Sequence, residues 1–167
     1  EQGRAAATAA SADTVPLGRV GAGTGATVAK WRGREHARPG GLGGAVARSG
    51  DVIVAALIAV NASGDIDDGA TNADVLADRF TLPEITPFDE NTTIGVVATN
   101  ARLDTVGCQL VAQSSHDGFG RALVPAHTSG DGDAVVVAAT GEIEAEVALI
   151  RTMAAAVTEQ AIRTSTD

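Results

Sequence analysis

The stretch Asn91-Thr92-Thr93-Ile94-Gly95-Val96-Val97-Ala98-Thr99-Asn100 places a pair of hydroxyl residues at the start of a predicted strand. The preceding residues, 81–90, include two prolines and are typical of a loop. A cut directly before Thr92 would give that residue a free α-amine beside its own hydroxyl. Such an amine is one of the few ways to activate an otherwise inert hydroxyl. The stretch therefore predicts a nucleophilic threonine made by self-cleavage, although threonine at a strand start also has an ordinary structural reading.

Outward from this stretch, the hydrophobic pattern predicts strands and helices within one domain. Alanine-rich residues 1–12 predict the end of a helix, and Asp104 is a candidate helix N-cap. The expected elements are an extended segment 20–31, a polar loop or hairpin 32–44, a strand 51–60 buried on both faces, a turn 64–69, a short helix 71–80, a strand 93–99, a helix from 104 to about 118, a strand 134–140 and a long helix from 142. This order predicts an α/β or α+β fold in which helices cover a largely antiparallel sheet.

Composition narrows the classes of function. The 167 residues carry a net charge of -9, which argues against a nucleic-acid surface. The longest apolar run, 52–60, is too short to span a bilayer, and no signal peptide is evident. A single cysteine, Cys108, excludes an internal disulfide and suits a reducing compartment. We therefore expect a cytoplasmic protein that acts without nucleic acid or membrane.

Lysine usage is unusual, because the chain has 11 arginines and a single lysine, Lys30. Lysine is a compact charge whose pKa can be lowered, whereas arginine remains charged. Lys30 is therefore a candidate for chemistry that arginine cannot perform. The alternative is a coding bias that happened to leave one lysine.

Polar candidates stand at the ends of four predicted extended segments. Lys30 ends the first and Asn61 the second, Thr92 precedes the third, and Asp131-Gly132-Asp133 precedes the fourth. If the strands lie antiparallel, these groups meet at one edge of the sheet. Asp-Gly-Asp as a simple turn and Asn61 as an ordinary strand exit remain the alternatives.

Each candidate suits a step of amide chemistry. Thr92 is the predicted nucleophile, and its new α-amine, with a reference pKa of about 8, is the predicted base. Asn61 offers an uncharged N–H to a developing oxyanion. Lys30 would lower the pKa of the neighbouring amine, and Asp131 and Asp133 would anchor Thr92 or balance the lysine.

These residues resemble a known family. The segment 18–26, the run 91–94, and His127-Thr128 with Asp131-Gly132-Asp133 resemble the β-aminopeptidase and D-aminopeptidase/esterase family. They are most similar to the related nylon-oligomer hydrolases, which use threonine rather than serine. The aminopeptidase branch has serine at the position of Asp131, so this chain departs from that branch there.

The resemblance implies a self-processing enzyme with a four-layer α-β-β-α sandwich of the N-terminal-nucleophile type. It implies cleavage between Asn91 and Thr92, with Lys30, Asn61, Asp131 and Asp133 completing the site. The chain would be the C-terminal portion of one hydrolase domain, with 1–91 ending the α subunit and 92–167 forming the β subunit. The N-terminal part of the fold would then be absent from this sequence.

The resemblance further implies a peptide or amide substrate, tetramers of processed protomers, and no cofactor or metal. Two other readings remain open. An acyltransferase similar to ornithine acetyltransferase shares the threonine nucleophile but passes its acyl group to an amine. A non-catalytic remnant would keep the fold without the chemistry.

Overall fold

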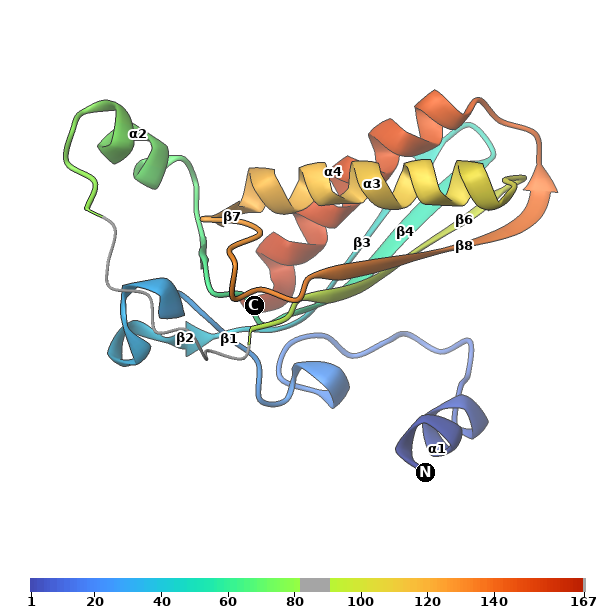
Figure 1. Ribbon diagram of the computed structural model, residues 1–167. Coiled ribbons are helices and arrows are strands. Elements are labelled where there is room, and N and C mark those ends of the chain that lie inside the picture. The colour runs from blue at the N-terminus through green and yellow to red at the C-terminus, as the bar shows by residue number, and fades with distance from the viewer. Residues whose placement is uncertain (82–90, 167) are drawn as a thin grey trace.

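The computed structural model describes residues 1–81 and 91–166 (Figure 1). Its main sheet has the order β3-β4-β6-β8. The strands are β3 (Gly41–Ser49), β4 (Val52–Val60), β6 (Ile94–Ala101) and β8 (Ala134–Ile143). β4 runs antiparallel to both β3 and β6, whereas β6 and β8 are parallel. The sheet is therefore largely antiparallel, as the sequence predicted.

Two long helices, α3 (Thr105–Ala122) and α4 (Val147–Arg163), cover one face of this sheet (Figure 1). Alternate side chains of β4 face the helices and are buried, so this strand is not buried equally on both faces. Asp104 caps α3 by accepting a hydrogen bond of 2.7 Å from the backbone N–H of Gly107. The helix continues past Gly118 because this glycine packs against the α4 backbone and does not end the helix.

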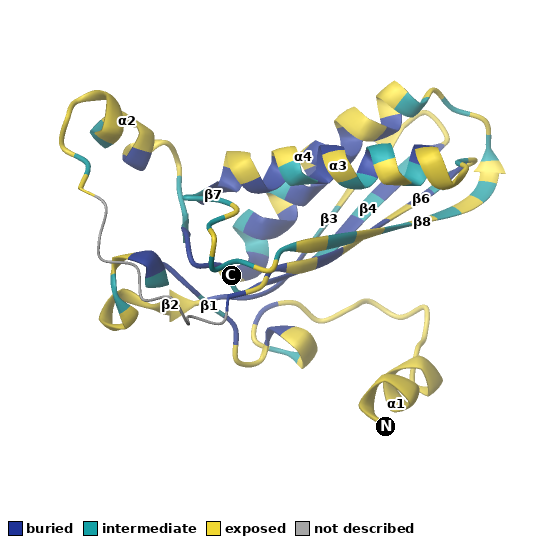
Figure 2. Ribbon diagram, viewed as in Figure 1, coloured by how far each residue is buried: buried dark blue, intermediate teal, exposed yellow. Residues whose placement is uncertain are grey.

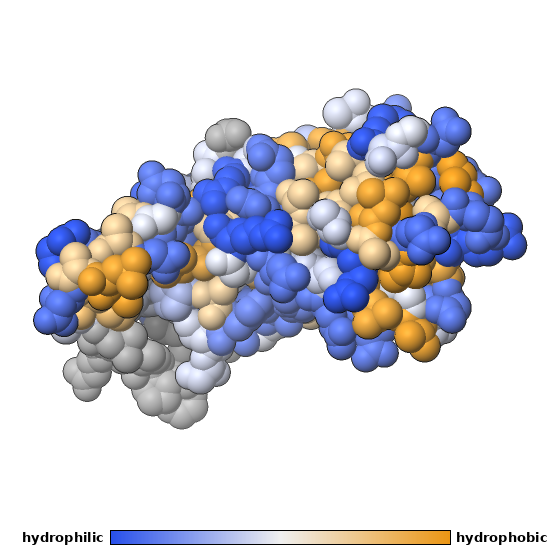
Figure 3. Space-filling view, turned by 90° about the horizontal axis from the view of Figure 1, so that it is seen from above, coloured by the Kyte–Doolittle hydropathy of each residue, from blue (hydrophilic) through white to orange (hydrophobic). Residues whose placement is uncertain are grey.

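On the opposite face of the sheet several apolar side chains are exposed. Along β8, exposed residues alternate with less exposed ones (Figure 2). Val46 is 62% exposed and Val136 is 64% exposed, and Ile94 and Val96 lie between them on the same face. By contrast, the helix side has polar and apolar side chains interspersed over its surface (Figure 3). Exposed apolar surface of this extent on one sheet face indicates that something further packs there.

Residues 20–31 do not form a strand of the main sheet, which differs from the sequence prediction. They form a 3-10 turn, η1 (Gly21–Gly23), the short strand β1 (Thr27–Val28), and the start of a second 3-10 turn, η2 (Lys30–Arg32). β1 pairs instead with β2 (Arg38–Pro39). The many small residues in this segment allow the backbone to turn closely against the sheet edge. The sequence pattern alone had predicted an extended segment here.

The remaining elements are short: α1 (Gln2–Thr8), η3 (Arg34–His36), β5 (Asp65–Ile66), α2 (Ala70–Leu76), β7 (Leu123–Val124) and η4 (Thr164–Thr166). The predicted loop at 81–90 lies outside the described residues from 82 on. Among the described residues, no helix combines the length and apolar character that crossing a membrane requires.

The first residues of β3, 41–44, lie in the segment that the sequence predicted as a polar loop or hairpin. The prediction missed the strand start because glycines obscured its pattern. Gly43 lies so close to α4 that a Cβ there would be 1.7 Å from the carbonyl oxygen of Ala161. The glycine is thus a contact residue between helix and sheet, where no side chain fits.

We expect Gly43→Ala to lower the free energy of unfolding by about 3 kcal/mol or to prevent folding, because helix and strand must separate to admit the methyl group. Gly120→Ala is the matched control, since a Cβ at this exposed position of α3 meets nothing within 4 Å. It should stabilise the helix by about 1 kcal/mol. Urea unfolding followed by circular dichroism measures both, and an equal stability of the two variants would contradict the packing argument.

Candidate active site

The end of β4 and the beginnings of β6 and β8 meet at one edge of the sheet (Figure 1). Ala59 of β4 lies beside Ile94, and Ile94 lies beside Ala134 of β8. An isolated parallel bridge between Asn91 and Asp131 extends the ladder by a further step. This topology brings together the polar groups that precede or follow these strands, as the sequence hypothesis required.

Thr92 lies directly against the peptide bond that precedes it. Its Oγ1 donates to the carbonyl oxygen of Asn91 at 2.6 Å, and the same oxygen accepts a hydrogen bond of 2.9 Å from the backbone N–H of Gly132. The Thr92 backbone N–H donates to the backbone carbonyl of Asn61 at 3.0 Å. Asn91 is buried, whereas Thr92 is exposed. The nucleophile candidate thus faces open space while the carbonyl beside it is tightly held.

Asn61 connects Thr92 to Lys30. Lys30 Nζ donates to Asn61 Oδ1 at 2.9 Å, and Thr27 N donates to the same oxygen at 3.1 Å. The side-chain oxygen of Asn61 therefore points toward the lysine, while its backbone oxygen holds Thr92. The lysine reaches the site through this amide.

The sequence prediction placed Lys30 at the end of a strand. In the structure Lys30 instead begins the turn η2. Backbone hydrogen bonds hold this turn against the exit of β4: Ala29 N donates to Gly64 O at 2.8 Å, and Trp31 N donates to Ser63 O at 3.0 Å. Both flanking residues are buried. The backbone hydrogen bonds on either side of Lys30 therefore fix its position.

Asp131 links two loops beside the nucleophile. Its Oδ1 accepts from Ser63 N at 2.9 Å. Its Oδ2 accepts from Thr128 Oγ1 at 2.7 Å and from Thr128 N at 3.2 Å. Because both carboxylate oxygens are engaged, Asp131 braces the β4 exit against the loop before β8.

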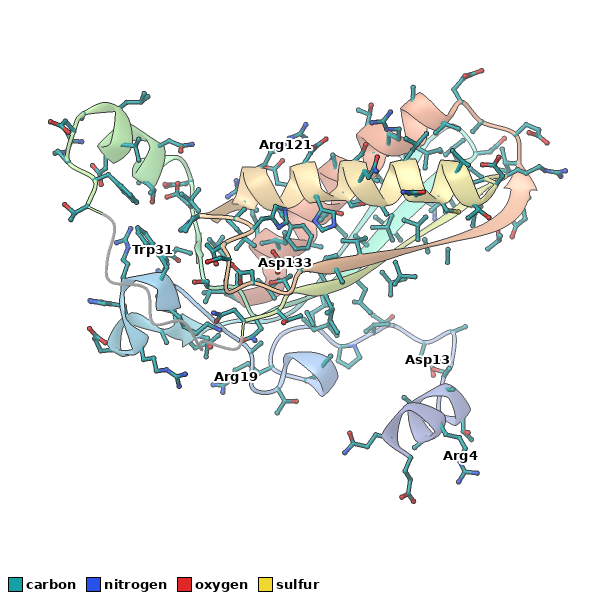
Figure 4. The ribbon with its side chains drawn as sticks, in the orientation of Figure 1. Arg4, Asp13, Arg19, Trp31, Arg121 and Asp133 are labelled. Atoms are coloured by element: carbon teal, nitrogen blue, oxygen red, sulfur yellow. The ribbon has the colours of Figure 1, made fainter. Side chains whose placement is uncertain are left out.

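Asp133 lies between α3 and the strand ends (Figure 4). Its Oδ1 accepts from the backbone N–H of Thr93 at 2.9 Å, and its Oδ2 lies 2.9 Å from His127 Nδ1. The carboxylate side chain is only 3% exposed, so these partners offset the cost of burying its charge. Asp133 thus holds the residue that follows the nucleophile.

Three rings pack around this carboxylate. His127 lies 4.8 Å from His116 and 5.3 Å from Phe119, measured between ring centroids. Burial lowers the pKa of His116, and the neighbouring His127 lowers it further, against the opposing effect of Asp133 and Asp117. Of the two histidines, His127 is the direct partner of Asp133, with its Nδ1 2.9 Å from the carboxylate.

The sequence analysis assigned no individual role or contact to His127, Thr128, Gly132 or Ser63. The run His127-Thr128 and the glycine of Asp131-Gly132-Asp133 were present in the motifs that resembled the family, and that was the available signal. Ser63 contributes only a backbone N–H, which no side-chain pattern reveals. Among the described residues, no three His, Cys, Asp or Glu side chains are grouped so as to hold a metal ion.

A cavity of about 300 Å³ opens beside the nucleophile candidate. Small residues surround it, and Asn61 supplies its polar side; the lining is Ala22, Gly25, Ala26, Ala59, Asn61, Thr92 and Ile94. A space of this size admits a short acyl group next to Thr92 Oγ1.

Comparison with known proteins finds relatives named as an aminopeptidase and as an oligomer endohydrolase. The chain is 42% identical over 149 residues to an uncharacterized aminopeptidase of Mycobacterium leprae, covering 79% of this chain and 39% of that protein. It is 33% identical over 161 residues to a 6-aminohexanoate-oligomer endohydrolase of Paenarthrobacter ureafaciens, covering 85% of this chain and 44% of that one. The chain thus spans about half or less of the length of these relatives.

Solved structures share the fold. A β-aminopeptidase of a Burkholderia species superposes with a TM-score of 0.72 at 21% identity, covering 97% of this chain and 49% of the other. An L-aminopeptidase D-Ala-esterase/amidase of Ochrobactrum anthropi, described as a variant of the Ntn hydrolase fold, superposes with a TM-score of 0.70 at 20% identity, covering 97% and 47%. The α+β class and the N-terminal-nucleophile type of fold predicted from the sequence are confirmed; the described residues supply one helix layer and one sheet layer.

A family model matches almost the whole chain, from residue 1 to residue 166. Together with the fold and the identity to its curated relatives, this match shows that the chain belongs to peptidase family S58.

Proposed function

We propose that the protein is a self-processing amide hydrolase in which Thr92 cuts the bond between Asn91 and Thr92 and then serves as the N-terminal nucleophile. The observation that carries the proposal is the position of Thr92 Oγ1, 2.6 Å from the carbonyl oxygen of Asn91. This contact places the hydroxyl beside the carbonyl group whose carbon it is proposed to attack.

The proposed cut begins when Thr92 Oγ bonds to the Asn91 carbonyl carbon and loses its proton. The carbon–nitrogen bond then breaks, the nitrogen takes up a proton, and the acyl group of Asn91 is left as an ester on Thr92. Water opens this ester, giving a carboxylate at Asn91 and restoring the Thr92 hydroxyl beside the α-amine that the shift released. Residues 1–91 and 92–167 become separate chains, the end of the α subunit and the β subunit.

In turnover, the new amine acts as the base for Thr92 Oγ, which forms an acyl-enzyme with the substrate. Lys30 supplies positive charge through Asn61 and keeps the amine neutral at a lower pH. Asn61 presents its amide to the oxyanion, Asp133 holds the backbone N–H of Thr93 after the nucleophile, and Asp131 holds the backbone N–H of Ser63 at the exit of β4. The hydrogen bonds from Lys30 to Asn61 and from Thr93 to Asp133, both beside Thr92, support this arrangement.

The exposed apolar face of the sheet supports the proposal that the full-length protein supplies a further part of the fold. Val46, Ile94, Val96 and Val136 would be buried by a second sheet from an N-terminal portion. Relatives more than twice as long as the matched region have the residues for such a portion. We propose that processed protomers then assemble as a tetramer.

The proposed substrates are short amino-acyl amides or peptides with a small or extended acyl part, of the β-amino, D-amino or ω-amino type. The names of the relatives support this class, since they are aminopeptidases and an endohydrolase of 6-aminohexanoate oligomers. The cavity of about 300 Å³ next to Thr92 suits an acyl group of this size.

Intact mass and a denaturing gel of the purified full-length protein test the self-cleavage. We expect two chains that separate between Asn91 and Thr92. An active protein that remains one chain would overturn the proposal, and an inactive, uncut one would favour a non-catalytic remnant. Product analysis with glutamate or ornithine added distinguishes hydrolysis from acyl transfer, because transfer that outruns hydrolysis would identify an acyltransferase.

His127 offers a further test, because it holds Asp133 while its own backbone is left-handed, with φ of 53°. Asparagine and glycine both accept this conformation, but only asparagine keeps an N–H for the carboxylate. We expect His127→Gly to slow self-cleavage about tenfold or more, which is the loss of one hydrogen bond to a charged group. His127→Asn should recover most of the rate; equal rates in the two variants would contradict the role of this hydrogen bond.

A further inference from the structure

We infer that the backbone N–H of Gly132 is the oxyanion donor for the cut at Asn91, an inference that rests on the proposed self-cleavage. The Gly132 N–H donates to the Asn91 carbonyl oxygen at 2.9 Å. When Thr92 Oγ attacks, this oxygen takes the negative charge, and the N–H is already aimed at it. A fixed donor of this kind stabilises the developing charge without reorganisation.

The local backbone explains why this donor is in place. Asn91 and Asp131 form a parallel bridge that extends the pairing of β6 with β8 by one step beyond the strands. The bridge directs the Gly132 N–H to the oxygen of the scissile bond and not to solvent. Asp131 directly precedes Gly132, and its side chain is held by hydrogen bonds from Ser63 and Thr128. These bonds fix the peptide that carries the Gly132 N–H.

The absence of a side chain at position 132 matters equally. A Cβ built there would lie 2.9 Å from Thr92 Oγ1, closer than such atoms approach in folded proteins. Glycine therefore permits the nucleophile and the donor to share the same carbonyl. Any other residue would displace one of them.

The side-chain amide of Asn61 was the oxyanion donor expected from the sequence. Its Oδ1 instead accepts from Lys30 and Thr27, and its contact with Thr92 runs through the backbone. The two donors need not compete, because the uncut chain and the substrate complex present different carbonyls. In the uncut chain, the backbone N–H that donates to the Asn91 carbonyl oxygen is that of Gly132.

The same N–H has a second use once the chain is cut. The ester between Asn91 and Thr92 Oγ has the same chemistry as the acyl-enzyme formed with substrate. When the Asn91 carboxylate leaves, the Gly132 N–H is released beside Thr92 Oγ1 and is available to the carbonyl of that acyl-enzyme. One backbone group would thus serve both maturation and turnover.

The test removes the N–H without adding a side chain. Cell-free translation of the full-length protein with a suppressor tRNA places glycolic acid at position 132, which turns the amide into an ester. The matched control places lactic acid at Ala134, whose N–H donates to Thr93 O at 3.0 Å in the next step of the same ladder. A pulse of labelled amino acid followed on denaturing gels gives the rate of cutting, and alkaline cleavage at the new ester verifies incorporation.

We expect the glycolic acid protein to cut itself at least ~100-fold more slowly, the usual effect of losing one oxyanion donor. The lactic acid control should cut at close to the parent rate. Cutting at the parent rate in both would overturn the inference and leave the proposed function standing. An equal slowing of both would also overturn it, because the ladder would then matter only for folding. If the unmodified protein is never cut, the proposed function itself fails.

Discussion

Thr92→Val leaves the chain in one piece and without hydrolase activity, which is the largest effect that the site predicts. Valine has the shape of threonine and lacks only the hydroxyl, so the position at the start of β6 is preserved. Without Oγ1, which lies 2.6 Å from the Asn91 carbonyl oxygen in the parent protein, there is no atom to attack the carbonyl carbon. We expect no detectable cutting over days by intact mass, against complete cutting of the parent.

Thr93→Val is the matched control for this experiment. Thr93 is fully buried, and its Oγ1 has no hydrogen-bond partner among the described residues. Replacing an unpaired buried hydroxyl with a methyl group is neutral or stabilising. The Thr93 variant should therefore be cut like the parent. A chain that is cut in Thr92→Val but intact in Thr93→Val would move the nucleophile to the second threonine.

The strands and helices with strong periodicity could be predicted from the sequence. Residues 52–60 and 134–140 are long apolar runs, and their strands fall where expected. The cap of α3 followed from Asp104 alone. In these segments local preference and burial agree, so the pattern is sufficient.

In the glycine-rich segments, the hydrophobic pattern predicted extended structure where the chain turns and a loop where a strand forms. Residues 20–31 are small and looked extended, yet they turn, whereas residues 41–44, predicted as part of a loop or hairpin, begin the edge strand β3. The reason is that Gly43 is required by contact with α4, a partner more than a hundred residues away. Tertiary packing of that kind leaves no mark in the local pattern.

The candidate site shows a similar division. The meeting of Asn61, Thr92 and Asp131-Gly132-Asp133 followed from the order of strand ends, because antiparallel and parallel neighbours fix which ends share an edge. The backbone contacts were beyond prediction. The hydrogen bond from Thr92 N to Asn61 O and the one from Gly132 N to Asn91 O join main-chain atoms. Because nearly every residue has such atoms, the sequence does not mark these contacts.

Lys30→Met should slow self-cleavage and turnover by at least ~100-fold while the fold survives, the size of effect that follows loss of one electrostatic stabiliser at a reacting group. Methionine keeps most of the aliphatic stem and removes the charge. Lys30 Nζ is linked to Thr92 through Asn61, at 2.9 Å and then 3.0 Å, so its charge acts at short range on the new amine. The backbone anchors at Ala29 and Trp31 do not depend on the side chain, which is why η2 should persist.

Arg32→Met provides the comparison, because it removes a cation from the same turn. The Arg32 guanidinium lies 4.8 Å from the centre of the Trp31 ring, and its side chain is exposed. Loss of an exposed charge there should leave cutting and turnover within a fewfold of the parent, since exposed charges are strongly screened. Melting temperatures establish that both variants fold, and gel time courses with substrate assays give the rates. If Lys30→Met matures and turns over substrate like Arg32→Met, Lys30 has no part in the chemistry, and the reactivity of Thr92 must come from its own amine, the two aspartates and the backbone around it.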